Sequence, residues 1–214
     1  MPEPVAPLAL PTTMTWEQLD SLPEEIAGEI ELWNGRVVWA PRGPSEHQVF
    51  SGRVFAAFER CVAAQWAVDI PQVGLETNVF FGRTGRDDYA TPNFLVYRRS
   101  DELYQDIRAD DVLPVGEIVS PYNIDRDMHA RRARYAAADI SWYWEVRLAR
   151  GASAIELVRV YALETRADSL PSGVQPEDSA DYVLVGEWTP AGNEDGIHIN
   201  RPFPISIPWS DLEY

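Results

Sequence analysis

The chain has 214 residues, enough for one domain with a sizeable core, and its 45% apolar and 11% aromatic content is typical of a globular protein and excludes a disordered one. Its 34 acidic residues outnumber the 18 basic residues, all of them arginine, and the formal net charge of -16 opposes general affinity for nucleic-acid phosphates. Any nucleic-acid site must therefore be a local basic patch, and the single cysteine, Cys61, excludes an intramolecular disulfide.

Residues 1–13 are rich in proline and alanine but lack the basic start and apolar centre of a signal peptide. No apolar run is long enough to span a bilayer as a helix. We therefore expect a cytoplasmic protein without membrane association, in which a flexible tail over residues 1–13 precedes a single domain over residues 14–214.

A short helix and a hairpin are predicted next. Thr15 and Gln18 fit a capping box, so a helix should run to about residue 22, before Pro23. Asn34-Gly35 favours a type I′ turn between strands at 29–33 and 36–39, because both residues tolerate the positive φ angles of that turn.

A long helix should follow from Ser45, placed as its N-cap, to about Trp66. Residues at helical spacing give it an apolar face in which Cys61 is a buried core thiol. The other members of that face are Val49, Val54, Phe58 and Val62.

The rest of the chain is predicted to form strands around one further helix, at 125–138. Strands are expected at 70–81, 93–97, 112–119 and 142–148, and the glycine- and charge-rich segment 82–88 ends the first of them. Hairpin-like segments at 154–163 and 182–188 follow, and then a Pro-rich end at 202–214. Strands separated by two substantial helices indicate an α/β or α+β sandwich with a mixed sheet.

The stretch from Glu117 to Val146 is the most informative part of the chain. It places an acidic side chain, Glu117, at the end of an apolar strand, a cationic side chain on the following helix, and a second strand after that helix. Phosphodiester hydrolysis uses a hard cation bound by oxygen ligands, with a nearby cationic group that stabilises charge. This order is similar to the one on which nucleases of one superfamily build a metal site.

Several segments in order carry a resemblance to a known family. They are Glu31-Leu-Trp-Asn-Gly35, Ser45-Glu-His-Gln48, Thr91-Pro-Asn-Phe-Leu-Val96, Glu117-Ile-Val-Ser-Pro121, Asp127 to Tyr135 and Trp142-Tyr-Trp144. Together they resemble the Uma-two family of putative restriction endonucleases, of the PD-(D/E)xK nuclease superfamily, from about residue 14 to 160 and more loosely beyond. The resemblance implies a restriction-endonuclease-like mixed central sheet flanked by helices, with extra hairpins at the N- and C-terminal ends, and metal-dependent DNA endonuclease activity.

The resemblance also implies a catalytic set of Glu117, Arg131, Asn93 and Glu31, with Glu117 and Asn93 as ligands of Mg²⁺ or Mn²⁺. Where the family has aspartate and lysine, this chain has Asn93 and Arg131. Asparagine offers only a neutral carbonyl oxygen to the cation, and a guanidinium with a pKa above about 12 cannot act as a general base. We therefore expect weakened or lost nuclease activity. A non-catalytic nucleic-acid- or protein-binding module on the same fold stays open, as does an interaction protein that uses its acidic surface.

Substrate binding is assigned to His47, Arg131 and Arg126. The arginines at 126, 131, 132 and 134 form either a local basic groove for DNA or ordinary ion pairs on a solubilising surface.

Asp87 or Asp88 could supply the missing carboxylate, or both could lie in a solvated turn. Tyr135 is expected to pack with a partner for its hydroxyl. A homodimer is implied by the resemblance alone.

Overall fold

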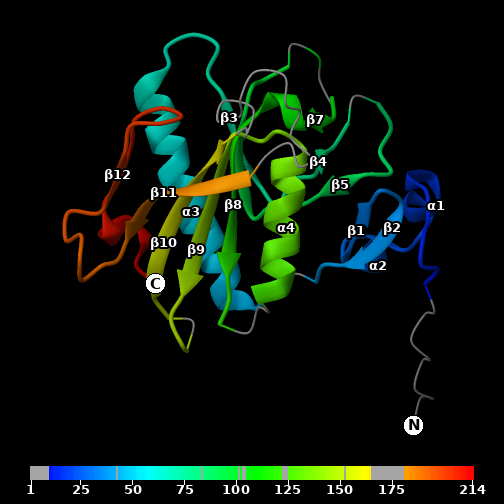
Figure 1. Cartoon of the computed structure of the whole chain (residues 1–214), viewed down its shortest axis with the longest axis horizontal. Coiled ribbons are helices and arrows are strands. Elements are labelled where there is room, and N and C mark those ends of the chain that lie inside the picture. Colours follow the sequence, from blue (N-terminus) through cyan, green and yellow to red (C-terminus); the bar gives the residue numbers. More distant parts are fainter. Residues whose placement is uncertain are drawn as a thin grey trace, which may run out of the picture.

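The computed structural model describes residues 10–41, 43–82, 84–100, 102, 105–121, 125–151, 153–164 and 181–214. Its centre is a six-stranded mixed sheet with the strand order β11-β10-β9-β8-β6-β3 (Figure 1). The strands are β3 (Gln72–Leu75), β6 (Phe94–Tyr97), β8 (Val112–Val119), β9 (Trp142–Leu148), β10 (Ile155–Glu164) and β11 (Asp181–Trp188). Strands β8 and β9 pair in parallel, and the other neighbours pair antiparallel. The predicted fold class is confirmed.

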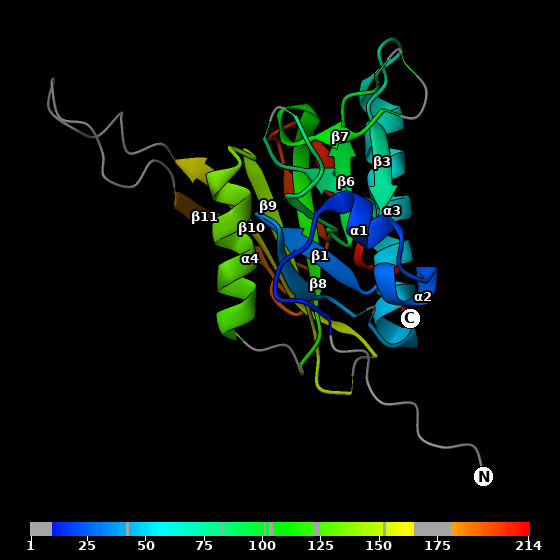
Figure 2. The same cartoon turned by 90° about the vertical axis from the view of Figure 1, so that its right-hand side faces the viewer.

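Two helices cover the two faces of this sheet. Helix α3 (Ser45–Gln65) lies on one side and α4 (Asp125–Ala137) on the other (Figure 2). Because successive side chains of a strand point to opposite faces, Ile118 of β8 packs in the α3-side core while its neighbour Glu117 points to α4. The carboxylate therefore lies under a helix and not in the apolar core of the α3 side.

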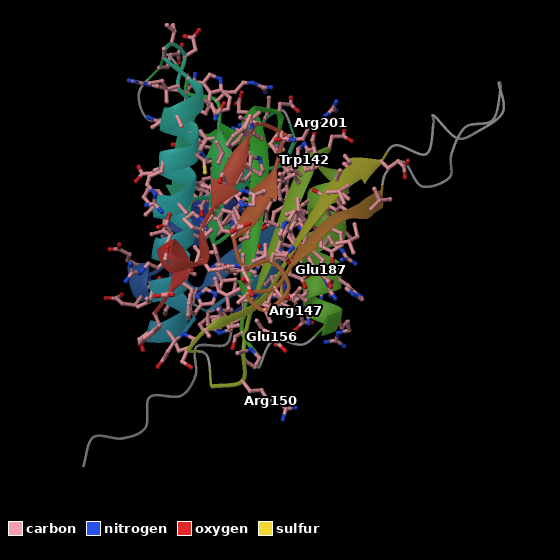
Figure 3. All side chains as sticks on the ribbon, turned by 90° about the vertical axis from the view of Figure 1, so that its left-hand side faces the viewer. Trp142, Arg147, Arg150, Glu156, Glu187 and Arg201 are labelled. Carbon is pink, nitrogen blue, oxygen red and sulfur yellow. The ribbon has the colours of Figure 1, made fainter. Side chains whose placement is uncertain are left out.

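Aromatic rings fill the α3-side core around the parallel pair of strands. Phe58 of α3 packs edge-on against Trp144, with ring centroids 5.1 Å apart, and lies 5.0 Å from Phe94. Gly116 makes room for this packing, because a Cβ at that position would lie 2.0 Å from Cζ of Phe94. The residue before Glu117 must therefore lack a side chain. Trp142 and Arg147 mark the two ends of β9 in Figure 3.

The N-terminal part forms a small lobe in which β1 lies next to β5 (Tyr89–Ala90). The capping box of Thr15 and Gln18 is present on α1 (Trp16–Asp20), and a second short helix, α2 (Glu24–Ala27), follows Pro23 where none was predicted. Strands β1 (Ile30–Trp33) and β2 (Arg36–Trp39) form the predicted hairpin. Its turn residues have φ angles of 51° at Asn34 and 74° at Gly35, as a type I′ turn requires.

Two residues assigned to the predicted tail pair with the N-terminal hairpin. Val37 donates its backbone N–H to the carbonyl of Thr12, and Thr13 forms a bridge with Arg36. These two residues extend the hairpin of β1 and β2 and are therefore ordered by it. Residues 1–9 of that predicted tail lie outside the described residues.

Smaller sheets complete the fold. The order β5-β4-β7 joins β4 (Val79–Phe80), β5 (Tyr89–Ala90) and β7 (Ile107–Arg108), and β12 (Ile197–Ile199) pairs with β13 (Ile205–Ile207) beside α3. Among the residues that the structure describes, 3-10 turns lie at Ala109–Asp111 and Trp209–Leu212. Hairpins therefore lie near both ends of the chain, as the resemblance implied.

Some predicted boundaries were wrong. The strand expected over 70–81 is split into β3 and β4. The hairpin-like segments expected at 154–163 and 182–188 are β10 and β11, which pair antiparallel with each other and belong to the central sheet. Ser45 is the first residue of α3 and makes no capping bond to its backbone; Pro44 is the N-cap. Val49 is 38% exposed, whereas Phe50 and Cys61 are buried. Among the described helices, none has the length and apolar character needed to cross a bilayer.

Candidate functional site

A cavity of about 650 Å³ lies between the hairpin of β1 and β2, the start of α3, the ends of β6 and β8, and α4. Four of the residues that the sequence singled out for catalysis contribute to its wall although they are far apart in the chain. These are Glu31, Asn93, Glu117 and Arg131, joined on the wall by His47, Glu76 and Asp127.

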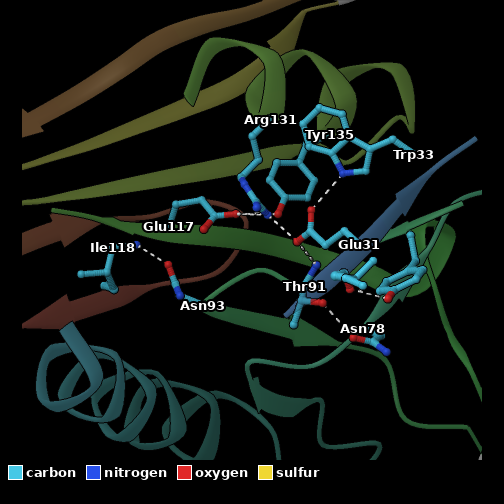
Figure 4. Close-up of polar contacts among 11 residues, drawn as sticks. Glu31, Trp33, Asn78, Thr91, Asn93, Glu117, Ile118, Arg131 and Tyr135 are labelled. Carbon is cyan, nitrogen blue, oxygen red and sulfur yellow. Dashed lines mark hydrogen bonds and ion pairs between the residues drawn. The ribbon is translucent and has the colours of Figure 1, made fainter. Parts of the chain in front are cut away.

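The guanidinium of Arg131 bridges two buried carboxylates (Figure 4). Its Nη1 donates to Oε1 of Glu31 at 2.8 Å and lies 3.4 Å from Oε1 of Glu117. Glu31 is 1% exposed and Glu117 5% exposed, so both negative charges are removed from water and Arg131 is the cation that compensates them.

Further donors hold the two carboxylates in place. Glu31 accepts the backbone N–H of Thr91 on Oε1 at 2.8 Å and the indole N–H of Trp33 on Oε2 at 2.9 Å. Glu117 accepts the hydroxyl of Tyr135 on Oε1 at 2.6 Å, which gives Tyr135 the predicted hydroxyl partner. Thr91 and Tyr135 lie on other segments than the glutamates that they contact, so the site forms only when the chain is folded.

Electrostatics within this group favour a charged Arg131. Burial alone would lower the pKa of Arg131, but the carboxylates of Glu31 and Glu117 raise it well above the ordinary value. Burial raises the pKa of Glu117, and Arg131 and Tyr135 offset part of that increase. Burial, with a contribution from Glu117, also raises the pKa of Tyr135. Arg131 is therefore a fixed cation and cannot serve as a proton acceptor.

Asn93 and His47 form hydrogen bonds with the backbone of Ile118, the residue after Glu117. Oδ1 of Asn93 accepts the N–H of Ile118 at 2.8 Å, and Nε2 of His47 lies 3.0 Å from the carbonyl of Ile118, to which it donates. Burial lowers the pKa of His47, which favours the neutral ring carrying its proton on Nε2. Both side chains therefore fix the position of β8 where the sequence had assigned metal and substrate contacts.

The donor set does not fit a divalent cation in this arrangement. Both oxygens of Glu31 accept hydrogen bonds, the amide oxygen of Asn93 holds β8, and Arg131 already contacts both carboxylates. Within the described residues, no group of three or more Asp, Glu, His or Cys side chains comes close enough together to hold a metal ion. A hard cation needs several converging oxygen ligands, so Mg²⁺ or Mn²⁺ would have to displace the guanidinium.

The predicted basic groove does not form around Arg131. Arg134 pairs with Asp88 and stacks over Trp33, 4.7 Å from its ring centroid, and Arg132 lies over Tyr161 at 4.8 Å. Arg126 has an 86% exposed side chain, pairs at 3.4 Å with Asp127, and is not among the described residues that line the cavity. The arginines of α4 are thus mostly engaged in local contacts, in agreement with the ion-pair alternative.

Asp87 and Asp88 are not spare metal ligands. Oδ1 of Asp87 accepts the backbone N–H of Trp16 at 2.5 Å, and Oδ1 of Asp88 accepts that of Asn34 at 2.9 Å in addition to its ion pair with Arg134. Both lie in the bend at 86–88, where Asp87 is exposed, and they hydrogen-bond the first residue of α1 and the hairpin turn instead of lining the cavity.

Sequence reasoning missed several contributors. Trp33 could have been found, because it lies two residues after Glu31 on the same face of one strand. The backbone N–H of Thr91 and the wall position of Glu76 had no sequence signal, since both depend on the pairing of distant strands.

A mixed sheet covered by a helix on each face, with the buried Glu117 on a central strand and the buried Glu31 brought beside it by the N-terminal hairpin, defines a restriction-endonuclease-like α/β fold. The chain belongs to the Uma2 family, described as putative restriction endonucleases, whose model matches residues 16–188. The fold is similar to the crystal structure of a putative nuclease of the DUF820 group from Anabaena variabilis, with a TM-score of 0.55 and 16% identity over 93% of this chain and 97% of that chain. At that identity the likeness is evidence for the fold alone. No curated protein matches the chain.

Proposed function

We propose that this protein is a nuclease-family member in which Mg²⁺- or Mn²⁺-dependent hydrolysis of DNA is strongly weakened or lost. The observation that supports this most directly is the position of Arg131, whose Nη1 lies 2.8 Å from Glu31 and 3.4 Å from Glu117. A guanidinium in that position neutralises the carboxylates that would otherwise attract a divalent ion.

Two substitutions act in the same direction. Asn93 gives the site one negative charge fewer than the aspartate of the family would, and its oxygen is engaged by the backbone of Ile118. Arg131 remains protonated, so it can hold a phosphate but cannot accept a proton from water. Each tenfold loss of rate corresponds to about 1.4 kcal/mol of transition-state stabilisation, so modest losses in charge and proton transfer suffice to suppress turnover.

Plasmid nicking tests this proposal. Wild-type protein, Asn93→Asp, Arg131→Lys and the double variant are each incubated with supercoiled DNA and Mg²⁺ or Mn²⁺. We expect wild type to nick no faster than Glu117→Ala, and the double variant to gain at least about tenfold, because it restores a carboxylate and a smaller, titratable cation.

The controls separate chemistry from folding. Adding Glu117→Ala to the double variant should abolish the gain, and circular dichroism should show that every variant is folded. Robust metal-dependent nicking by wild type that Glu117→Ala abolishes would overturn the proposal. A folded double variant without any gain would show that positions 93 and 131 are not the cause of the loss.

A residual DNA endonuclease is the second candidate. It is favoured by Oε2 of Glu117, which has no hydrogen-bond partner among the described residues and belongs to a side chain on the cavity wall. One carboxylate oxygen thus remains for a cation that enters after Arg131 moves. If hydrolysis is lost entirely, the protein acts as a binding module, and its net charge of -16 disfavours nucleic acid as the main partner.

A further inference from the structure

We propose that Glu76 is a positioning residue of the candidate site, which acts on Glu117 through the backbone of Ile118. Glu76 lies in the bend that follows β3 and belongs to the cavity wall. The inference deepens the proposed function, because that function rests on how Glu117 is held. It does not require that DNA is cleaved, so the two can be tested separately.

A closed ring of contacts connects Glu76 to the backbone of Ile118. Oε1 of Glu76 accepts a hydrogen bond from Nε2 of Gln48 at 2.7 Å, and the backbone N–H of Glu76 donates to the carbonyl of Asn93 at 3.2 Å. His47, the preceding residue of α3, donates to the carbonyl of Ile118. Oδ1 of Asn93 accepts the N–H of that same residue (Figure 4). Glu76 therefore contacts both of the segments that hold Ile118.

The backbone conformation of Glu76 indicates that its side chain is needed at this position. Its φ angle is 45°, in the left-handed region that glycine adopts freely and that most L residues avoid. The other non-glycine residues with a positive φ in the described parts of the chain are of types that tolerate this region, namely Asn34, Asp69 and Asp139. Such strain persists where surrounding contacts determine the conformation. Glycine would serve a bend better, so we attribute the glutamate to its contact with Gln48.

The first turn of α3 is the part of the ring that depends most on Glu76. Pro44 is the N-cap of this helix, and no side chain forms a capping hydrogen bond there. Nδ1 of His47 is buried and has no hydrogen-bond partner among the residues that the structure describes. The hydrogen bond between Gln48 and Glu76 therefore ties the turn that carries His47 to the end of β3.

The position of Ile118 in turn sets the position of the Glu117 carboxylate. Ile118 packs in the α3-side core, whereas Glu117 points to α4 from the adjacent position of β8. The donors of Tyr135 and Arg131 lie 2.6 and 3.4 Å from Oε1 of Glu117. A shift of the strand at Ile118 changes both distances, so a residue that restrains Ile118 also restrains the site.

Amide hydrogen exchange, followed by NMR on the full-length protein, tests the proposal without DNA. Glu76→Gly removes the acceptor of Gln48 but adopts a positive φ without strain, so the urea midpoint should stay close to that of wild type. We expect the amide of Ile118 to exchange at least about tenfold faster, because a hydrogen bond to a charged group is lost. The amide of Val160, on β10, should keep its rate. Glu76→Gln keeps an acceptor and should stay within about threefold of wild type.

The matched control is Asp69→Gly, which makes the same backbone change at an exposed acid whose φ angle is 50° and which does not line the cavity. It should leave the exchange of Ile118 at the wild-type rate. Equal rates for Ile118 in Glu76→Gly and Asp69→Gly would overturn the proposal. A uniform acceleration of all slow amides in Glu76→Gly would also overturn it, because the residue would then only stabilise the fold.

A second readout uses the double variant Asn93→Asp, Arg131→Lys, in which nicking is expected to return. Adding Glu76→Gly should lower its kcat by about tenfold with little change in KM, and Glu76→Gln should retain most of the rate. An unchanged kcat after Glu76→Gly in a double variant that nicks DNA would contradict the proposal. If the double variant does not nick, the proposed cause of the lost activity fails, and the exchange rate of Ile118 still decides the role of Glu76.

Discussion

Two buried glutamates occupy paired positions on the neighbouring parallel strands, and only one of them belongs to the cavity. Glu117 of β8 and Glu145 of β9 are in register and are 5% and 3% exposed. Glu145 pairs with Arg147 of its own strand, 2.5 Å away and 34% exposed, whereas Glu117 contacts Arg131 and Tyr135 of a helix and meets Glu31 through Arg131.

The difference shows what distinguishes a glutamate that only stabilises the fold from one that belongs to the candidate site. Glu145 has its ion-pair partner two residues away on the same strand, so the pair needs only local structure. Arg147, which is 34% exposed, is the member of the pair that contacts water. Glu117 depends on residues 86 and 14 positions away in sequence, Glu31 and Arg131, that only the tertiary fold brings together. Burial is nearly equal in the two cases, so convergence of distant elements on a cavity is the property that marks the site.

The largest effect should come from removing the cation on the Glu117 side. Arg131→Ala leaves two buried carboxylates without compensation, and we expect it to lower the free energy of unfolding by about 3–5 kcal/mol in urea titrations. Arg147→Ala, on the Glu145 side, should cost less, about 1–3 kcal/mol, because it leaves one buried carboxylate without its cation instead of two and because Arg147 is itself 34% exposed. Equal costs for the two variants would remove the distinction between the two glutamates.

A smaller effect should come from the hydroxyl of Tyr135. Tyr135→Phe removes the 2.6 Å hydrogen bond to Glu117, and bonds to charged groups contribute about 1.5–3 kcal/mol. Tyr143→Phe is the matched control, because the Tyr143 hydroxyl is buried and has no partner within the described parts of the chain. Its removal should be neutral or stabilising in the same thermal or urea titration. A larger loss for Tyr143→Phe than for Tyr135→Phe would contradict the hydrogen-bond assignment.

The smallest effect concerns pH. Burial raises the pKa of Glu117 above its ordinary value of about 4.5, so the folded protein binds a proton more tightly than the unfolded chain does. This contribution to stability is complete below about pH 4.5 and is lost as pH rises through the raised pKa.

Urea titrations of wild type and Glu117→Gln across that range isolate the effect. The unfolding free energy of wild type should fall relative to that of Glu117→Gln as pH increases, by at most about 1.4 kcal/mol per pH unit for one proton. A difference that grows in the opposite direction would mean that the fold stabilises the charged form of Glu117.

Much of the fold was predictable because its signals are local. The turn at Asn34-Gly35 depends on backbone preferences, and the apolar runs of β8 and β9 are long enough to identify as buried strands. The two-residue strands β5 and β7 were missed, because each exists only through pairing with β4. Ser45 was misassigned as the N-cap because the helix begins one residue earlier than its capping preference suggested, with Pro44 at the N-cap position and no side-chain capping bond.

The sequence predicted which residues come together better than it predicted the contacts that they make. Ordered motifs identified Glu31, Asn93, Glu117 and Arg131, and the fold brings all of them to one cavity wall. The sequence could not show that Asn93 and His47 hold the backbone of Ile118, or that Arg131 lies between the carboxylates, because these contacts depend on side-chain positions set by distant elements.

Binding of Mn²⁺, followed by electron paramagnetic resonance during a titration, tests most directly whether Arg131 takes the place of a metal ion. We predict that wild type shows no bound Mn²⁺ that depends on Glu117, whereas Asn93→Asp combined with Arg131→Lys binds one ion that is released when Glu117→Ala is added. One tightly bound Mn²⁺ in the wild-type protein that disappears in Glu117→Ala would contradict the account.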